Sequence, residues 1–324
     1  MEKVRELLKK NKLIFGIWNK FYQRKLNKKE EAKLKGKYEF IDRSKKSENL
    51  CIILAGYKEF LWKEVFERIE KFIPKDFDVC IVSPGMFNEK LVELCEKNSW
   101  SYLSVEMNKV TLAQNIAIHL HKSAKYIYKL DEDMFITEGF FENLKKTYLK
   151  VKEENKYKVG FVAPLINING YSYRRILEKT NLLSKFEEKF KSAYMDATPG
   201  EQIIENGEIA KFMWGNGNQE LKNIDEISRK FSKEEFSYSI CPIRFSIGAI
   251  LLPRETWNKM EKFDVCRGNN MGLDEVKLCQ FCTIYSRVMV ISENILVGHF
   301  SYGPQTSEMK KYYQEHKEIF SLKS

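Results

Sequence analysis

Apolar and polar positions follow two alternating patterns along the middle of the chain. Short apolar runs predict four buried strands, at residues 50–55, 78–82, 101–105 and 126–130. The segments between them carry apolar residues at helical spacing and predict three helices, at residues 59–72, 88–97 and 111–121. Strands and helices that alternate at these lengths form right-handed crossovers. The pattern therefore predicts an α/β fold with a mostly parallel, Rossmann-like sheet flanked by helices.

Composition supports a folded domain and excludes several classes of protein. The chain is 43% hydrophobic and 13% aromatic, which is enough for a core, and its 16 Gly and 7 Pro are too few for a collagen-like or disordered chain. No apolar run reaches the ~18 residues of a spanning helix, and the run 13–18 is too short for a signal peptide. The seven Cys residues are scattered mostly in apolar segments, as reduced thiols are. These features predict a cytoplasmic protein.

The basic charge is concentrated at the N-terminus. Residues 1–48 hold 16 Lys/Arg against 7 Asp/Glu, although the whole chain has a net charge of only +10. Apolar residues recur at helical spacing between these lysines, which predicts a basic amphipathic helical tail. Such a helix either lies on an anionic membrane surface, with Trp18 at the interface, or packs on the rest of the protein. The near-neutral remainder offers no basic groove, so a nucleic-acid partner is not expected.

Two aspartates follow the fourth predicted strand. Asp131 and Asp133 lie where parallel strands place their carboxyl ends, which is where such sheets bind ligands. Paired carboxylates suit Mg²⁺ or Mn²⁺ bound together with substrate phosphates. A solvated acidic pair is the alternative, but the apolar residues on both sides make unpaired charge costly there. A haloacid-dehalogenase-type phosphatase also begins with a strand and D-x-D. That family has Thr or Val two residues after the second Asp, where this chain has Phe135.

The segment around these aspartates, together with three later segments, resembles the nucleotide-sugar-dependent glycosyltransferases of the GT-A fold, especially the large family 2 type. The similar segments, in the family's order, are residues 112–133, 244–254, 263–278 and 295–299. The first contains the D-x-D motif, the second is similar to the acceptor-side loop and strand, the third contains the Phe-Asp and acidic segments, and the fourth ends in His299. The resemblance covers roughly residues 50–300 and implies a GT-A fold.

The resemblance also implies a set of site residues. Asp133, Asp131 and His299 would bind Mn²⁺ or Mg²⁺. Gly248 and Ala249 would face the acceptor, and Trp214, which lies among glycines in the long insertion 165–243, suits sugar stacking. The donor-binding positions would be Ala55, Gly56, Tyr57, Ser83, Asn115, Asp131 and Glu132. The first and second strands end in sequences that differ from the family's pattern, so a UDP-linked and a GDP-linked donor both stay open.

Asp274 and Glu275 are the predicted catalytic carboxylates. An inverting transfer needs a base for the acceptor hydroxyl, and the two residues follow Gly272 at the predicted start of a helix, where the dipole favours negative charge. Alignment on Gly272 selects Asp274 as the base, whereas alignment on Leu278 selects Glu275. We favour Asp274. The pair Cys279 and Cys282 falls on the same helix and is interpreted as core packing without zinc.

Together these features predict a basic tail (1–48), a GT-A domain (49–305) and a C-terminal helix (306–324). Residues 49–140 would bind the nucleotide-sugar and residues 141–305 the acceptor. The predicted enzyme moves a hexose or related sugar to a hydroxyl of a glycan or lipid-linked glycan, with inversion, in bacterial-type surface polysaccharide or glycoconjugate synthesis. It would be peripheral at the inner membrane leaflet. The alternatives are a Mg²⁺-dependent phosphohydrolase or nucleotidyltransferase, and a degenerate GT-A binding module.

Overall fold

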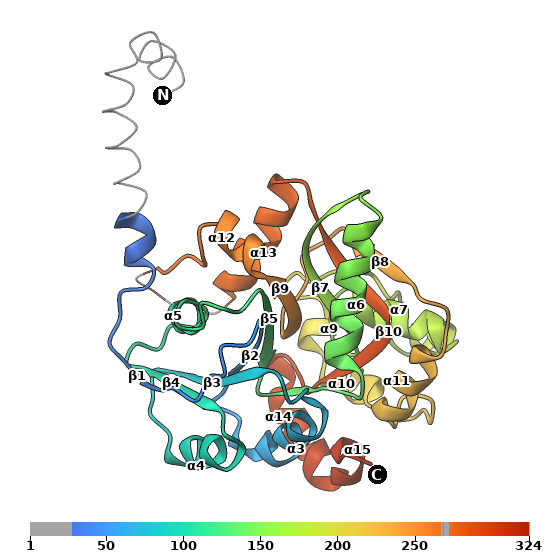
Figure 1. Ribbon diagram of the computed structural model, residues 1–324. Coiled ribbons are helices and arrows are strands. Elements are labelled where there is room, and N and C mark those ends of the chain that lie inside the picture. Colours follow the sequence, from blue (N-terminus) through green and yellow to red (C-terminus); the bar gives the residue numbers. More distant parts are fainter. Residues whose placement is uncertain (1–27, 267, 269–271, 324) are drawn as a thin grey trace.

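A large sheet forms the centre of the structure (Figure 1). The structure is a computed structural model that describes residues 28–266, 268 and 272–323, so most of the predicted basic helix lies outside the described residues. Within these residues ten strands form one sheet: β1 (Tyr38–Ile41), β2 (Asn49–Leu54), β3 (Asp78–Pro84), β4 (Ser101–Val105), β5 (Tyr126–Asp131), β6 (Met134–Phe135), β7 (Lys158–Ile166), β8 (Tyr238–Cys241), β9 (Ala249–Pro253) and β10 (Arg287–His299).

The strand order is β1-β4-β3-β2-β5-β9-β7-β10-β6, with β8 paired to β10. Strands β4, β3, β2 and β5 run parallel to one another, and β7 runs parallel to β10. Strand β9 lies antiparallel between β5 and β7. The prediction of an α/β fold with a mostly parallel sheet flanked by helices is confirmed.

Helices follow most of the strands. Among the described residues they are α3 (Trp62–Phe72), α4 (Glu89–Asn98), α5 (Val110–Leu120), α6 (Phe140–Glu153), α7 (Ser172–Lys179), α8 (Leu183–Phe190), α9 (Gln202–Glu205), α10 (Gly207–Met213), α11 (Ile224–Ser232), α12 (Arg254–Lys259), α13 (Leu273–Ile284), α14 (Thr306–Glu315) and α15 (Lys317–Phe320). None of these helices is long and apolar enough to cross a membrane. The predicted C-terminal helix is two helices, α14 and α15, separated at His316, whose backbone angles (φ −136°, ψ 45°) are not helical.

The order of the first four parallel strands creates a crevice in the sheet. From β2 the chain moves outward through β3 to β4 and then crosses back to β5 on the other side of β2. Right-handed crossovers then place α3 and α4 on one face of the sheet and α5 on the opposite face, as Figure 1 shows. A reversal of this kind opens a ligand crevice at the carboxyl ends of the two strands beside it. Leu54 and Asp131 are paired at this edge.

The part of the predicted helical tail nearest the domain belongs to the sheet. Residues 28–32 are helical, but Tyr38–Ile41 form the edge strand β1, which pairs antiparallel with β4. Phe40 and Ile41 pack against the core, and the Phe40 ring meets that of His121 edge-on with centroids 5.7 Å apart. Burial of these apolar side chains on the sheet outweighs the helical tendency of the preceding lysine-rich segment. The predicted helical tail, residues 1–48, is therefore not helical at residues 38–41.

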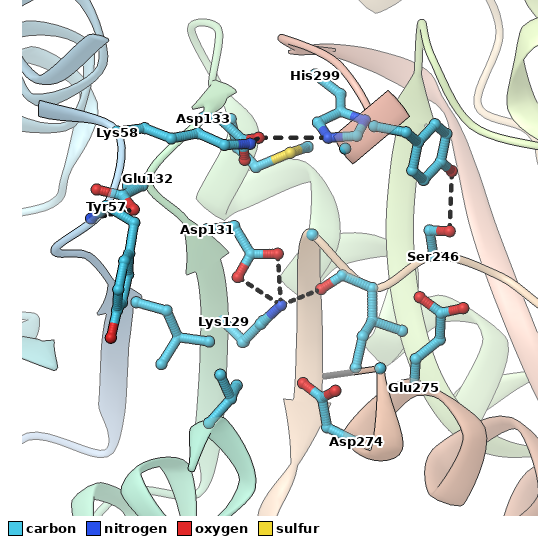
Figure 2. A pocket seen from close by; sticks show the side chains of 18 of the residues that line it. Tyr57, Lys58, Lys129, Asp131, Glu132, Asp133, Ser246, Asp274, Glu275 and His299 are labelled. Atoms are coloured by element: carbon cyan, nitrogen blue, oxygen red, sulfur yellow. Dashed lines mark hydrogen bonds and ion pairs between the residues drawn. The ribbon is translucent and has the colours of Figure 1, made fainter. Parts of the chain in front are cut away.

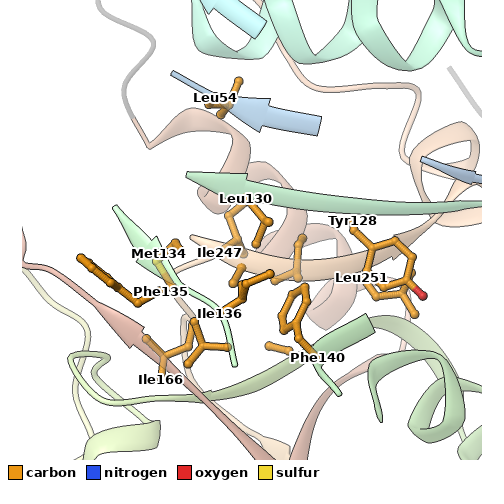
Figure 3. Close-up of a cluster of buried hydrophobic side chains, with 14 of the residues drawn as sticks. Leu54, Tyr128, Leu130, Met134, Phe135, Ile136, Phe140, Ile166, Ile247 and Leu251 are labelled. Carbon is orange, nitrogen blue, oxygen red and sulfur yellow. The ribbon is translucent and has the colours of Figure 1, made fainter. Parts of the chain in front are cut away.

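Buried apolar side chains pack around β5, the strand that leads to the site. Figure 3 shows Tyr128 and Leu130 of β5 beside Leu251 of β9 and Phe140 of α6. All four side chains are at most 1% exposed. Burial of an aromatic or branched side chain of this size contributes roughly 1.5–3 kcal/mol of stability. Strand β5, which ends in the acidic motif, is therefore fixed by its apolar face.

Candidate active site

A cavity of about 410 Å³ opens at the carboxyl ends of the parallel strands (Figure 2). The ends of β2, β5, β7 and β10 contribute to its walls, and so does the segment before β9, because β9 runs in the opposite direction and begins at this edge. The sequence-predicted site residues that line the cavity are Ala55, Tyr57, Asp131, Glu132, Asp133, Gly248, Asp274, Glu275 and His299. The structure therefore brings together residues from five segments that are far apart in the sequence.

The alternation of side chains along β5 places a lysine beside the first aspartate. Residues i and i+2 of a strand share a face, so Lys129 lies next to Asp131, and its Nζ is 2.7 and 2.8 Å from the two carboxylate oxygens. The same ammonium donates to the carbonyl of Ile247 at 3.0 Å. Lys129 is 4% exposed. Its three contacts hold the ammonium in one place, as the dashed lines in Figure 2 show.

The cavity changes the protonation of Asp131. About a third of this side chain is exposed, but it faces a cavity below the protein surface. Burial raises the pKa of Asp131 to about 6, against the opposing effect of Lys129 and with a further contribution from Asp133. Asp131 therefore gains a proton at a higher pH than an ordinary aspartate does, although its carboxylate contacts Lys129.

Glu132 holds the end of β2 in place. Its two carboxylate oxygens accept hydrogen bonds from the backbone N–H groups of Gly56 (3.0 Å) and Tyr57 (2.9 Å) and from the indole of Trp62 (2.6 Å). These three donors occupy the side chain, which is only 6% exposed. In this structure Glu132 therefore contacts the protein, and its predicted role in donor binding would be indirect, through the shape of the residue 55–58 segment.

Gly56 allows this segment to turn tightly over the cavity. Its backbone has φ +146°, a conformation that residues with a side chain rarely adopt, and a Cβ at this position would lie 2.6 Å from the sulfur of Met86. The turn leaves Tyr57 56% exposed, with its hydroxyl donating to the carbonyl of Pro84 at 2.7 Å. The ring of Tyr57 thus forms an aromatic wall at one end of the cavity.

Asp133 lies between two potential cations. Lys58 forms an ion pair with Asp133 Oδ2, and His299 Nε2 lies 3.5 Å from the same oxygen. Burial alone would raise the pKa of Asp133, but Lys58 and His299 overcome this effect and hold the pKa well below its ordinary value. Asp133 is therefore ionised throughout the neutral range although it is 4% exposed.

Asp133 and His299 fit a bound divalent cation. His299 Nδ1 is 2.9 Å from the carbonyl of Ile168, an acceptor, so the ring proton lies on Nδ1 when the imidazole is neutral. Nε2 then presents a lone pair to a carboxylate oxygen, an arrangement that a cation between them would stabilise. Asp131 is not part of this group, because its oxygens face Lys129. The described residues contain no group of three His, Cys, Asp or Glu side chains that could hold a metal, so the predicted three-ligand set is not assembled.

The two predicted catalytic carboxylates begin helix α13 and have different partners. Gln114 Nε2 donates to Asp274 Oδ2 at 2.7 Å, whereas Arg244 forms an ion pair with Glu275 Oε1. Burial raises the pKa of Glu275 against the effect of Arg244. The neutral amide of Gln114 binds one oxygen of Asp274 and orients the carboxylate; within the described part of the chain no side chain is seen to donate to the other oxygen. Figure 2 shows Asp274 on the side of Lys129 and Glu275 on the side of Ser246.

Four predicted site residues that are buried lie outside the cavity lining. Asn115 is 0% exposed and its amide is occupied by Phe263 N and O, the carbonyl of Lys33 and the indole of Trp257. Trp214 is also 0% exposed, and its indole donates to the carbonyl of His299 at 3.0 Å. Ser83 and Ala249 are buried within β3 and β9. The structure therefore places neither Asn115 nor Trp214 in the lining of the cavity.

Sequence reasoning missed four polar side chains that contact the predicted site residues. They are Lys58, Gln114, Lys129 and Arg244. Lys129 could have been found, because a lysine inside an apolar strand two residues before an aspartate shares its face. Lys58 gave no such signal, because its partner is 75 residues away and the contact depends on the pairing of β2 with β5.

No protein-family model matches the chain, and no curated protein matches it in sequence. One similar solved structure is the crystal structure of GalNAc-T7 with UDP, GalNAc and Mn²⁺, at 13% sequence identity and a TM-score of 0.46. The match covers 85% of this chain and 51% of that chain, so this chain spans about half the length of GalNAc-T7.

Proposed function

We propose that this chain is a metal-dependent glycosyltransferase of the GT-A type that moves a sugar from a nucleotide diphosphate-sugar to a hydroxyl of a glycan acceptor. One observation carries the proposal. A single cavity contains Asp133 and His299, a pair that fits a divalent cation, and separately the carboxylates Asp274 and Glu275 in the first turn of α13. Glycosyl transfer needs a group that stabilises the leaving diphosphate and a base that deprotonates the attacking hydroxyl. The two groups act on opposite sides of one sugar.

The donor would lie against the ends of β2 and β5. A divalent cation, Mn²⁺ or Mg²⁺, held by Asp133 and His299 would stabilise the negative charge that develops on the departing diphosphate. Tyr57 offers an exposed aromatic face beside this position, and the backbone of Gly56 permits close approach. Glu132 would act by holding this backbone in place through its hydrogen bonds to Gly56 and Tyr57.

The acceptor would enter from the side of α13. Asp274 is the proposed base, because among the described residues its side-chain hydrogen-bond partner is the neutral amide of Gln114, which binds one oxygen and orients the carboxylate. The other oxygen would take the acceptor's proton. Glu275 would instead position the acceptor together with Arg244. A base on the face of the sugar opposite the diphosphate corresponds to inversion. The glycan acceptor of a surface polysaccharide, free or lipid-linked, follows from the family resemblance.

The proposal is tested by binding before activity. Thermal denaturation is measured with UDP, GDP, CDP and their sugars, each with Mn²⁺ or a chelator, on the wild type and on Asp133→Asn. A ligand at about 100 times its dissociation constant stabilises a protein by roughly 2.7 kcal/mol. We expect one nucleotide to raise the melting temperature only with metal, and the effect to be lost in the variant.

Two other results would overturn the proposal. Release of phosphate or pyrophosphate from a nucleotide without any acceptor would indicate a phosphohydrolase or nucleotidyltransferase at the same aspartates. Metal-independent glycan binding that survives Asp133→Asn, with no nucleotide effect, would indicate a binding module.

A further inference from the structure

Lys58 occupies the place where the cation of the proposed function would bind. Its ammonium contacts Asp133 Oδ2, and His299 Nε2 is directed at that same oxygen from 3.5 Å. An ammonium and a divalent cation need the same carboxylate oxygen here, so their binding competes. The charge of Asp133 is therefore already compensated before any metal arrives.

The two lysines of the cavity differ in their freedom to move. Lys129 is on a central strand, its side chain is 5% exposed, and it has three contacts with Asp131 and Ile247. Lys58 follows the end of β2, its side chain is 27% exposed, and Asp133 is its one hydrogen-bonding partner in the described part of the chain. A flexible four-carbon side chain with a single polar contact and open space beside it can leave that contact.

We propose that Lys58 is a displaceable cation: its ammonium pairs with Asp133 when no metal is bound and must be moved away for a divalent cation to bind Asp133 and His299. The inference rests on the proposed function for the metal site. It makes Lys58 a positioning residue that holds the Asp133 carboxylate in place when no metal is bound, and it predicts that the lysine weakens metal binding.

The test measures Mn²⁺ affinity by titration calorimetry on the full chain without nucleotide. Lys58→Met removes the competing ammonium and should bind Mn²⁺ at least about tenfold more tightly than the wild type. Lys58→Arg keeps a cation at this position and should stay close to the wild type. Asp133→Asn should abolish binding. Lys90→Met is the matched control, because it removes a lysine–carboxylate pair with Glu59 that lies outside the cavity.

Lys58→Met also leaves a buried carboxylate without its partner, so its folding is checked by circular dichroism, with Lys58→Gln as a second neutral variant. If these variants fold only in the presence of Mn²⁺, the ion has replaced the ammonium, as proposed. Unchanged or weaker Mn²⁺ affinity in both neutral variants overturns the inference. Absence of Mn²⁺ binding in the wild type and both neutral variants overturns it as well. Nucleotide binding is measured separately, so tight Mn²⁺ binding without any nucleotide effect would reject the proposed function but keep this inference.

Discussion

The indole N–H of Trp62 donates a 2.6 Å hydrogen bond to the carboxylate of Glu132, the middle residue of the acidic motif. This contact connects helix α3 to the loop after β5 and leaves the two flanking aspartates to face the cavity. Glu132 thus supports the wall of the site, while Asp131 and Asp133 place their carboxylates in the cavity.

Glu132→Gln is expected to lower the free energy of unfolding by about 2–4 kcal/mol. A glutamine has one acceptor oxygen in place of two, so its NH₂ group would face one of the N–H donors of Gly56, Tyr57 or Trp62. Urea unfolding followed by tryptophan fluorescence measures the change. Glu138→Gln is the control, since that glutamate is exposed. Equal stability of the two variants would contradict the role given to Glu132.

The partners of Asp274 and Glu275 predict a difference between two conservative variants. Asp274→Asn should lower the kcat of sugar transfer by about 10²–10⁴-fold, because it removes the proposed base. Glu275→Gln should mainly raise the KM for the acceptor, because Glu275 is ion-paired with Arg244. Steady-state kinetics with a fixed donor separates the two effects. Donor nucleotide affinity should be unchanged in both, and the reverse pattern would make Glu275 the base.

The parallel half of the sheet was predictable because its strands are local apolar runs. Residues 101–105 were predicted as a strand and form β4, and the helix predicted at 88–97 is α4, shifted by one residue. The position of β9 between β5 and β7 was not predictable, because no local pattern encodes which strands pair. The same limit applies to the site. Asp133 is recognisable from its neighbours in sequence, whereas its pairing with Lys58 depends on the fold.

The raised pKa of Asp131 predicts a pH dependence of stability. Its pKa is about 6 in the folded protein and about 3.9 in an unfolded chain. Between pH 4 and pH 6 the folded state therefore holds the proton that the unfolded state has lost, and the contribution of Asp131 to stability falls as the pH rises. The unfolding free energy of the wild type minus that of Asp131→Asn should therefore decrease from pH 4 to pH 6 and then level off. A difference that rises or stays flat in urea unfolding would contradict the raised pKa.

Asn115→Ala separates a structural role from the donor-binding role that the family resemblance implies. The side chain connects α5 to the backbone of Phe263 and to the indole of Trp257, and it is fully buried outside the cavity lining. Its removal leaves several buried polar groups without partners and should lower the free energy of unfolding by about 2–4 kcal/mol. Asn258→Ala, at an exposed position of α12, should change it by less than about 0.5 kcal/mol. The metal-dependent nucleotide affinity of Asn115→Ala, measured well below its melting temperature, should stay within about twofold of the wild type. Asn115 does not line the cavity, and the wall at Gly56 and Tyr57 is held by hydrogen bonds to Glu132. A large loss of nucleotide affinity without loss of stability would instead support the donor-binding role of Asn115.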